Sequence, residues 1–149
     1  MRHSALALLA AFVRAGCGGG SGRLSRADLA NRATKICTDQ AATIAQIPRG
    51  PANATNATGY LGAVLSVVEK GVKQFHRLEP PGEQEATYRA FLGELDRNVD
   101  ILRTLRAAGA ANQRRDYVAG LAALHRSRLR IDRLERRLGF TECAGSSSA

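Results

Sequence analysis

Apolar side chains recur at every third or fourth position along most of this chain, which is the spacing of one face of an α-helix. The pattern covers four stretches that are separated by proline, glycine and small polar residues. No stretch alternates apolar and polar residues in the manner of a β-strand. The pattern therefore predicts an all-α chain with four amphipathic helices.

The first predicted helix has a clear start and a clear stop. The sequence Ser25-Arg26-Ala27-Asp28 reads as a capping box, in which side chains satisfy free backbone amides at a helix start. Apolar positions then run at helical spacing from Leu29 to Ile47. Pro48 follows and cannot continue the helix, so we expect it to end there.

The second predicted helix follows a polar segment, "PANATNATG" at 51–59. We expect this segment to be a loop with several candidate N-caps, Thr58 among them. Its two Asn-x-Thr triplets match the glycosylation acceptor pattern, and we interpret them as loop and capping residues. Apolar positions then continue to Leu78, and Pro80-Pro81-Gly82 breaks the helix.

The third predicted helix begins with Glu83 and Glu85, which suit the positive end of a helix dipole, and ends near Gly109. The fourth runs from Ala111 or Asn112 to Leu138, with Gly139 as its stop. Its expected inward positions are Tyr117, Val118, Leu121, Leu124, Ile131, Leu134 and Leu138.

Four amphipathic helices with short connections predict an antiparallel up-down four-helix bundle over residues 25–143. A chain of 149 residues fits a single domain, and its hydrophobic content of 44% suffices for a core. The small polar residues 144–149 are expected to form a disordered tail.

The region ahead of the first helix has the layout of a leader. Arg2 and His3 precede an almost wholly apolar run of ten residues, 4–13, which is too short to span a bilayer and fits a secretory signal peptide. Cys17 follows, and then a run of glycine and serine. We therefore expect a signal peptide over 1–16 and a flexible tether over 17–24.

The end of this leader resembles the lipobox of bacterial lipoproteins. Ala15, Gly16 and Cys17 match the last three positions of that motif, whereas Arg14 stands where the family carries an aliphatic residue. The resemblance implies that Cys17 carries lipid and holds the protein on a membrane. Two alternatives stay open: an ordinary signal peptidase releases a secreted protein, or Cys17 is a chance thiol after a hydrophobic helix start.

The three cysteines fit this interpretation. If Cys17 carries lipid, Cys37 and Cys143 remain as a pair, and an oxidising compartment favours a disulfide between them. That bond would join the first helix to the C-terminal tail.

The net charge of +9 comes mainly from arginine, with 19 arginines against three lysines. Such a bias is typical of proteins from high-G+C genomes, which weakens charge as a functional clue. One feature of it is regular: five arginines share a face of the fourth helix and could contact phosphates of lipid headgroups or of wall polymers. They are Arg115, Arg126, Arg130, Arg133 and Arg137. The competing interpretation is an ordinary solvated face.

Other side chains of the fourth helix bear on this face. Arg128 pairs at helical spacing with Asp132, and Asp132 with Arg136. Arg128 and Glu135 fall on the inward side, where they would pair or line a polar pocket. We expect no binding of nucleic acid, because aromatic residues do not interleave with the arginines.

The sequence lacks the motifs of the common helical enzymes and carriers. It has no Glu-x-x-His pair for di-iron, no Cys-x-x-Cys-His for haem c and no Gly-x-Ser-x-Gly elbow. Only a bis-histidine haem between His76 and His125 stays open, and we do not favour it. We therefore expect no enzyme, no metal and no cofactor.

In overall layout the chain resembles the small helical lipoproteins and secreted proteins of high-G+C Gram-positive bacteria. These combine a leader ending at cysteine, a Gly/Ser tether and a helical domain with one cysteine in the first helix and one after the last. The resemblance implies an extracytoplasmic protein, anchored by lipid or secreted, and brings no activity with it. We expect an interaction or structural module, and as the alternative a binder of anionic envelope components through the arginine face.

Overall fold

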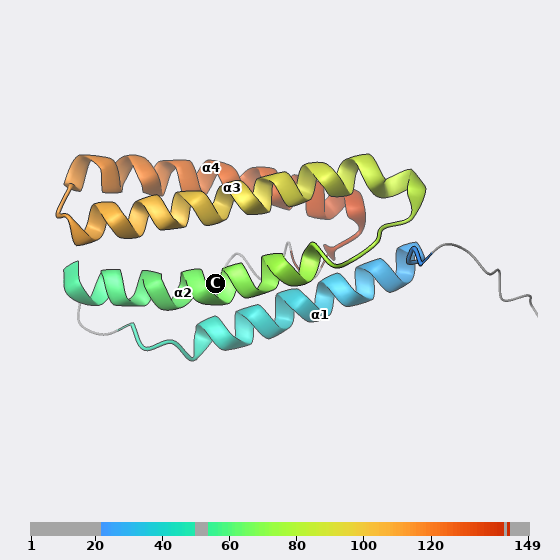
Figure 1. Cartoon of the computed structure of the whole chain (residues 1–149), viewed down its shortest axis with the longest axis horizontal. Helices are drawn as coiled ribbons and strands as arrows, with labels where there is room; N and C mark the ends of the chain where they lie inside the picture. The colour runs from blue at the N-terminus through green and yellow to red at the C-terminus, as the bar shows by residue number, and fades with distance from the viewer. Residues whose placement is uncertain (1–21, 50–53, 142, 144–149) are drawn as a thin grey trace, which may run out of the picture.

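The computed structural model describes residues 22–49, 54–141 and 143 (Figure 1). This part of the chain contains helices and no strand, so the prediction of an all-α chain with four helices is confirmed. The elements are α1 (Arg26–Ala45), α2 (Ala54–Phe75), the short 3-10 helix η1 (Gly82–Gln84), α3 (Glu85–Ala110) and α4 (Arg114–Leu138).

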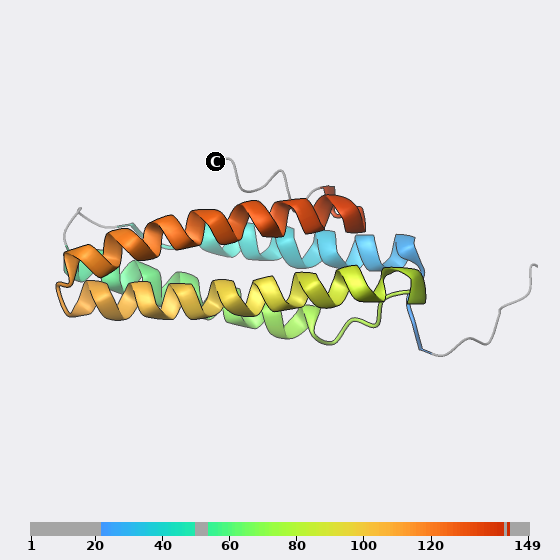
Figure 2. The same cartoon turned by 90° about the horizontal axis from the view of Figure 1, so that it is seen from above.

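The four helices lie along one long axis in a two-by-two arrangement. Figure 1 shows α3 and α4 above α2 and α1, and Figure 2 shows α4 and α1 on one side with α3 and α2 on the other. Neighbours in sequence pack on each other, α1 on α2, α2 on α3 and α3 on α4. The start of α1 and the end of α4 therefore lie at the same end of the molecule.

The predicted helix caps are present at both ends of the domain. The backbone N–H of Asp28 donates to the Ser25 hydroxyl at 3.1 Å, which confirms the serine half of the predicted capping box. The Asp28 carboxylate accepts from the Ser25 hydroxyl at 2.7 Å and not from a backbone amide, so the other half of the prediction is wrong. At the end of α4, Gly139 adopts a φ of 82°, and its N–H donates to the Arg136 carbonyl. The N–H of Phe140 donates to the Glu135 carbonyl at 2.8 Å, which completes a Schellman motif.

We expected a loop over 51–59, and this prediction is wrong from Ala54 onward. The second helix begins at Ala54, so Thr58 lies inside α2 and is not its N-cap. Two alanines, Ala54 and Ala57, favour helix strongly enough to extend it through the polar residues between them. The helix also ends at Phe75, before Leu78.

The end of the bundle at which α1 starts holds an aromatic core. The rings of Phe75, Tyr88, Phe91 and Phe140 pack together, with centroids 5.2 to 6.5 Å apart. The Tyr88 hydroxyl donates to the Phe75 carbonyl at 2.7 Å, so this buried polar group is satisfied. Leu29, Ala33, Ile36, Ile131 and Leu138 complete this core.

A second core lies between α2 and α3 and consists of Leu65, Val72, Val99 and Leu102. The helices approach closely beside it. A Cβ at Gly71 would overlap the Gln40 side chain of α1, and a Cβ at Gly120 of α4 would lie 2.8 Å from the Leu105 side chain of α3. The Gln40 side chain is flexible and can move away from Gly71, so Gly120 is the position at which glycine permits a close helix contact.

Two residues of α4 that we expected to face inward are exposed. Val118 is 57% exposed and Leu121 is 45% exposed, so this prediction is wrong. The reason is the length of α1: this helix stops at Ala45, short of the end of the bundle at which α4 begins (Figure 1). The first turns of α4 consequently pack on α3 and lack α1 as a neighbour.

Candidate functional site

Several expected features fall outside the part of the chain that the structure describes. These are the leader 1–16 with Arg14, the lipidation candidate Cys17, the tether up to residue 21 and the tail 144–149. Within the described ranges, no helix combines the length and the hydropathy needed to cross a membrane.

Four of the five predicted arginines lie together on the exposed side of α4. Arg115, Arg126, Arg133 and Arg137 are all exposed and form no ion pair with any described residue. The 3.6-residue turn places them within about 40° of one another around the helix axis. The structure thus presents them as one cationic face.

The fifth arginine is not part of this face. The Nε atom of Arg130 lies 2.9 Å from the Glu94 carboxylate of α3, and its side chain is 33% exposed. Arg130 therefore links α4 to α3. We remove it from the residues that were predicted to bind anions.

Exposed apolar side chains lie among these arginines. Leu129 is 46% exposed and lies one helical turn from both Arg126 and Arg133, while Val118 lies one turn after Arg115. We call the four arginines with Val118 and Leu129 the α4 outer face.

The acidic residues of α4 do not neutralise the positive charge of the α4 outer face. Glu135 is buried at 3% exposure. Asp132 is 18% exposed and lies 3.4 Å from Arg128. Asp116 is in the first turn of the helix, about 100° around the axis from Arg115. The face is therefore cationic and partly apolar.

Seven of the other thirteen described arginines are paired with a carboxylate. Arg23, Arg26, Arg89, Arg97, Arg103, Arg128 and Arg130 each lie within ion-pair distance of a carboxylate. Of the ten described arginines that have no such partner among the described residues, six are on α4. The positive charge of the domain is thus concentrated on this helix.

The two predicted disulfide cysteines meet at the same end of the molecule as the aromatic core. The Sγ atoms of Cys37 and Cys143 are at disulfide bonding distance, with their Cα atoms 5.4 Å apart. Phe140 and the short turn after Gly139 bring Cys143 back beside α1. The bond joins the middle of α1 to the chain just beyond α4.

A carboxyl group lies directly beside this disulfide. One carboxyl oxygen of Glu135 and the two sulfur atoms all lie within 4.8 Å of one another. The Glu135 Oε2 atom is buried and accepts no hydrogen bond from the described residues. Burial raises the pKa of Glu135 to about 7, an effect that nearby Arg128 and Arg136 oppose and Asp132 reinforces.

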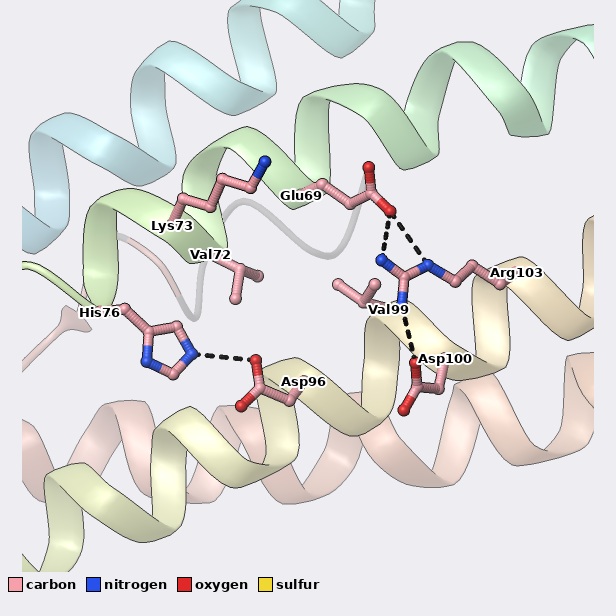
Figure 3. Close-up of a pocket in the computed structure, with 8 residues that line it drawn as sticks. All are labelled: Glu69, Val72, Lys73, His76, Asp96, Val99, Asp100 and Arg103. Atoms are coloured by element: carbon pink, nitrogen blue, oxygen red, sulfur yellow. Dashed lines mark hydrogen bonds and ion pairs between the residues drawn. The ribbon is translucent and has the colours of Figure 1, made fainter.

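A pocket of about 330 Å³ opens between α2 and α3 (Figure 3). Val72 and Val99 form its apolar part, and polar pairs flank them. The Nε2 atom of His76 lies 2.9 Å from Asp96, while the Arg103 guanidinium contacts Glu69 at 2.7 Å and Asp100 at 3.0 Å.

Most polar side chains of this pocket pair with one another. His76–Asp96 and Arg103–Glu69 both bridge α2 and α3, so they brace the two helices. The lining contains no serine, threonine or cysteine that could serve as a nucleophile for His76. The pocket therefore has the character of a solvent-exposed bracing network.

Three of these features were not predicted from the sequence. The helical pattern predicted that Glu135 faces inward, but it could not predict that Glu135 lies against the disulfide, since three separate chain segments meet there. The pocket was not predicted either, because it depends on the rotation of α2 relative to α3. The burial of Phe140 did have a signal, because an apolar residue directly after a helix-ending glycine is typical of a Schellman motif.

Comparisons with protein-family models, with curated proteins and with solved structures gave no match for this chain.

Proposed function

We propose that this chain is an antiparallel up-down four-helix bundle that is exported, is anchored by lipid on Cys17 and works as a non-enzymatic binding module of the cell envelope. Its ligand is an anionic envelope component, which contacts the α4 outer face. The helix directions in Figure 1 and the cysteine arrangement support the architecture, and the leader motif supports the location.

One observation carries the binding role: the cationic side chains of the α4 outer face have no carboxylate partner among the described residues. A guanidinium is weakly hydrated and presents a fork of donors that matches phosphate and carboxylate groups. The exposed Val118 and Leu129 add apolar contact area beside this charge. A surface of this kind favours anionic lipid headgroups or a phosphate-bearing polymer at a membrane.

Vesicle binding tests this proposal. In the test variant, Arg126, Arg133 and Arg137 are replaced together by Glu. The matched control carries the same replacement at Arg32, Arg77 and Arg106. These three arginines are also exposed and form no ion pair with described residues. Binding is measured by co-sedimentation with phosphatidylglycerol–phosphatidylcholine vesicles and with phosphatidylcholine alone.

We expect the parent protein to bind only the anionic vesicles and to dissociate as salt rises, because salt screens surface charge. With about 1 kcal/mol per arginine near a charged membrane, the α4 variant loses about a hundredfold in affinity. The control variant keeps most of its binding. Equal losses in the two variants would show that only net charge matters and would overturn the role of the α4 outer face.

The same two variants distinguish the sources of the anionic groups. If soluble polyphosphate binds through the α4 outer face and anionic vesicles do not, the ligand is a polymer and not a headgroup. If neither probe binds at low salt, the anion-binding role is wrong, and a partner protein becomes the alternative.

The anchor is tested separately by the intact mass of the protein from its native host, measured without reducing agent. We expect a chain that begins at Cys17, carries acyl groups and lacks two hydrogens because of the disulfide. A chain without acyl groups would contradict the anchor and support secretion.

A further inference from the structure

The group formed by Cys37, Glu135 and Cys143 has a property that a purely structural disulfide does not need. Cys143 is fully buried, Cys37 is half-buried and Glu135 is 3% exposed. A carboxyl oxygen and both sulfur atoms lie within 4.8 Å of one another. Three side chains from α1, α4 and the segment after α4 therefore share one small space.

Glu135 has little structural use in this position. Its Oε2 atom accepts no hydrogen bond from the described residues, and Arg128, the cation that acts on it most, lies 3.4 Å from Asp132 instead. A buried carboxyl without a direct partner costs free energy, and an apolar side chain of similar size would avoid that cost. What the carboxyl can offer here is a proton.

We propose that the Cys37–Cys143 disulfide is a site of thiol–disulfide exchange with a dithiol reductant, and that the Glu135 carboxyl group gives its proton to the sulfur atom that leaves. The role differs from the anion binding proposed for α4 and does not depend on it.

The first step of the exchange follows from the burial of the two cysteine residues. A thiolate of the reductant attacks Sγ of Cys37, because the residue Cys37 is only partly buried whereas Cys143 is fully buried. A new S–S bond forms between the reductant and Cys37, and the Cys37–Cys143 bond breaks. The electron pair goes to Sγ of Cys143, which takes the proton from Glu135 and becomes a thiol.

The second step completes the two-electron reduction. The other thiol of the reductant, after losing its proton to water, attacks the reductant sulfur that is bound to Cys37. The reductant becomes a cyclic disulfide, and Cys37 leaves as a thiolate that takes a proton from water. Glu135 regains its proton from solvent, so the protein ends with two thiols and an unchanged carboxyl group.

The charge on Glu135 controls the first step. A neutral carboxyl group donates to the developing thiolate of Cys143, whereas a carboxylate repels it in a buried space. The charged groups that act on Glu135 are Arg128, Asp132 and Arg136 of α4, while α1 contributes the uncharged Cys37. Exchange is therefore expected to be faster when Glu135 is protonated.

Reduction by dithiothreitol tests this proposal. The rate constant is measured from about pH 5.5 to about pH 8.5 and divided by the fraction of reductant present as thiolate, because only the thiolate attacks. The parent is compared with Glu135→Gln, which keeps the size and neutrality of the acid but has no acidic proton. The matched control is Glu94→Gln, a carboxyl group of α3 that lies outside the cysteine cluster.

We expect the thiolate-corrected rate constant of the parent and of Glu94→Gln to fall by at least about tenfold as pH rises through 7, in line with the contribution of a positioned general acid. Glu135→Gln should show a slow rate without this pH dependence. Identical profiles for the parent and Glu135→Gln would overturn the proposal.

A second measurement separates direct attack from attack on an unfolded form. The parent is reduced with and without about 0.5 M urea, a concentration that raises the unfolded fraction measurably but leaves the protein folded. We expect an unchanged rate. A rate that rises in proportion to the unfolded fraction would show that the disulfide reacts only after opening, and it would also overturn the proposal.

Discussion

At the scale of single residues, the carboxyl group of Glu135 links the stability of this protein to pH. Burial raises the pKa of Glu135 to about 7 in the folded protein, whereas its ordinary value is 4.5. The folded state therefore holds this proton more tightly than the unfolded state. Where the folded state binds the additional proton, the free energy of unfolding falls as pH rises.

We accordingly predict that the parent loses stability between about pH 4.5 and about pH 7, and that the loss is complete above this range. The upper bound of the loss is about 3 to 4 kcal/mol, because a difference of one in pKa corresponds to about 1.4 kcal/mol. Glu135→Gln removes this dependence. Urea denaturation at several pH values measures this dependence. If the free energy of unfolding changed with pH equally in the parent and in Glu135→Gln, the burial of an ionisable Glu135 would be contradicted.

Arg126 and Arg130 show how two identical residues on one helix acquire different roles. Arg130 lies 2.9 Å from Glu94 of α3, while Arg126 is exposed without an ion-pair partner among the described residues. They differ by about 40° around the α4 axis, which is enough to turn one side chain toward α3 and the other toward solvent. A small difference in position around the helix axis thus decides whether an arginine of α4 pairs with α3 or faces solvent.

At the scale of elements, the end of α4 determines where the chain goes next. Gly139 adopts a φ of 82°, and the reversal that it permits places Phe140 in the aromatic core and Cys143 beside α1. An L side chain is strained in this conformation, and glycine is not. A Cβ at Gly139 would meet no atom within 4 Å, so backbone strain is the sole cost of a substitution here.

We predict that Gly139→Ala lowers the free energy of unfolding by about 1 kcal/mol. Gly139→Asn should cost less, because asparagine tolerates the left-handed region better than alanine does. Thermal and urea denaturation of the two variants measure this order. The reverse order, or no loss for alanine, would contradict the left-handed end of α4.

The lengths of α1 and α4 explain the exposed apolar residues of the bundle. The 20 residues of α1 rise about 30 Å, whereas the 25 residues of α4 rise about 38 Å. The first turns of α4 therefore extend beyond α1, and Val118 and Leu121 face solvent. An apolar face that the bundle itself does not cover is available for contact with other molecules.

At the scale of the whole molecule, the disulfide is the main covalent constraint on the bundle. It joins residues that are 106 positions apart, so it closes almost the whole helical domain into one loop. A cross-link over so long a loop reduces the conformational entropy of the unfolded chain substantially. The effect on stability is distinct from the exchange chemistry, because it depends on the bond and not on Glu135.

We predict that Cys37→Ser with Cys143→Ser lowers the free energy of unfolding by about 5 kcal/mol, the loop-entropy value for a loop of this length. The reduced parent should show a similar loss in urea denaturation, which controls for the effect of the serines. A loss below about 1 kcal/mol in both would contradict a stabilising cross-link.

Much of this fold could be predicted from local patterns. The apolar spacing of the four stretches predicted four helices because the 3.6-residue period is a property of consecutive residues. The caps at Ser25 and Gly139 could be recognised since they depend on atoms only a few positions apart. The start of α2 was placed after its actual start at Ala54, because helix-favouring alanines competed there with polar residues that are also typical of loops.

The sequence by itself therefore determined the four helices and their approximate bounds, whereas the pairing of Cys37 with Cys143 followed from it only on the premise that Cys17 carries lipid. Only the tertiary structure decided which arginines are free, which apolar residues of α4 are covered and which carboxyl group lies against the disulfide. The physical reason is that these outcomes depend on the relative length and rotation of helices that are distant in sequence. A pattern along one helix specifies its apolar face, but it does not specify the neighbour that this face meets.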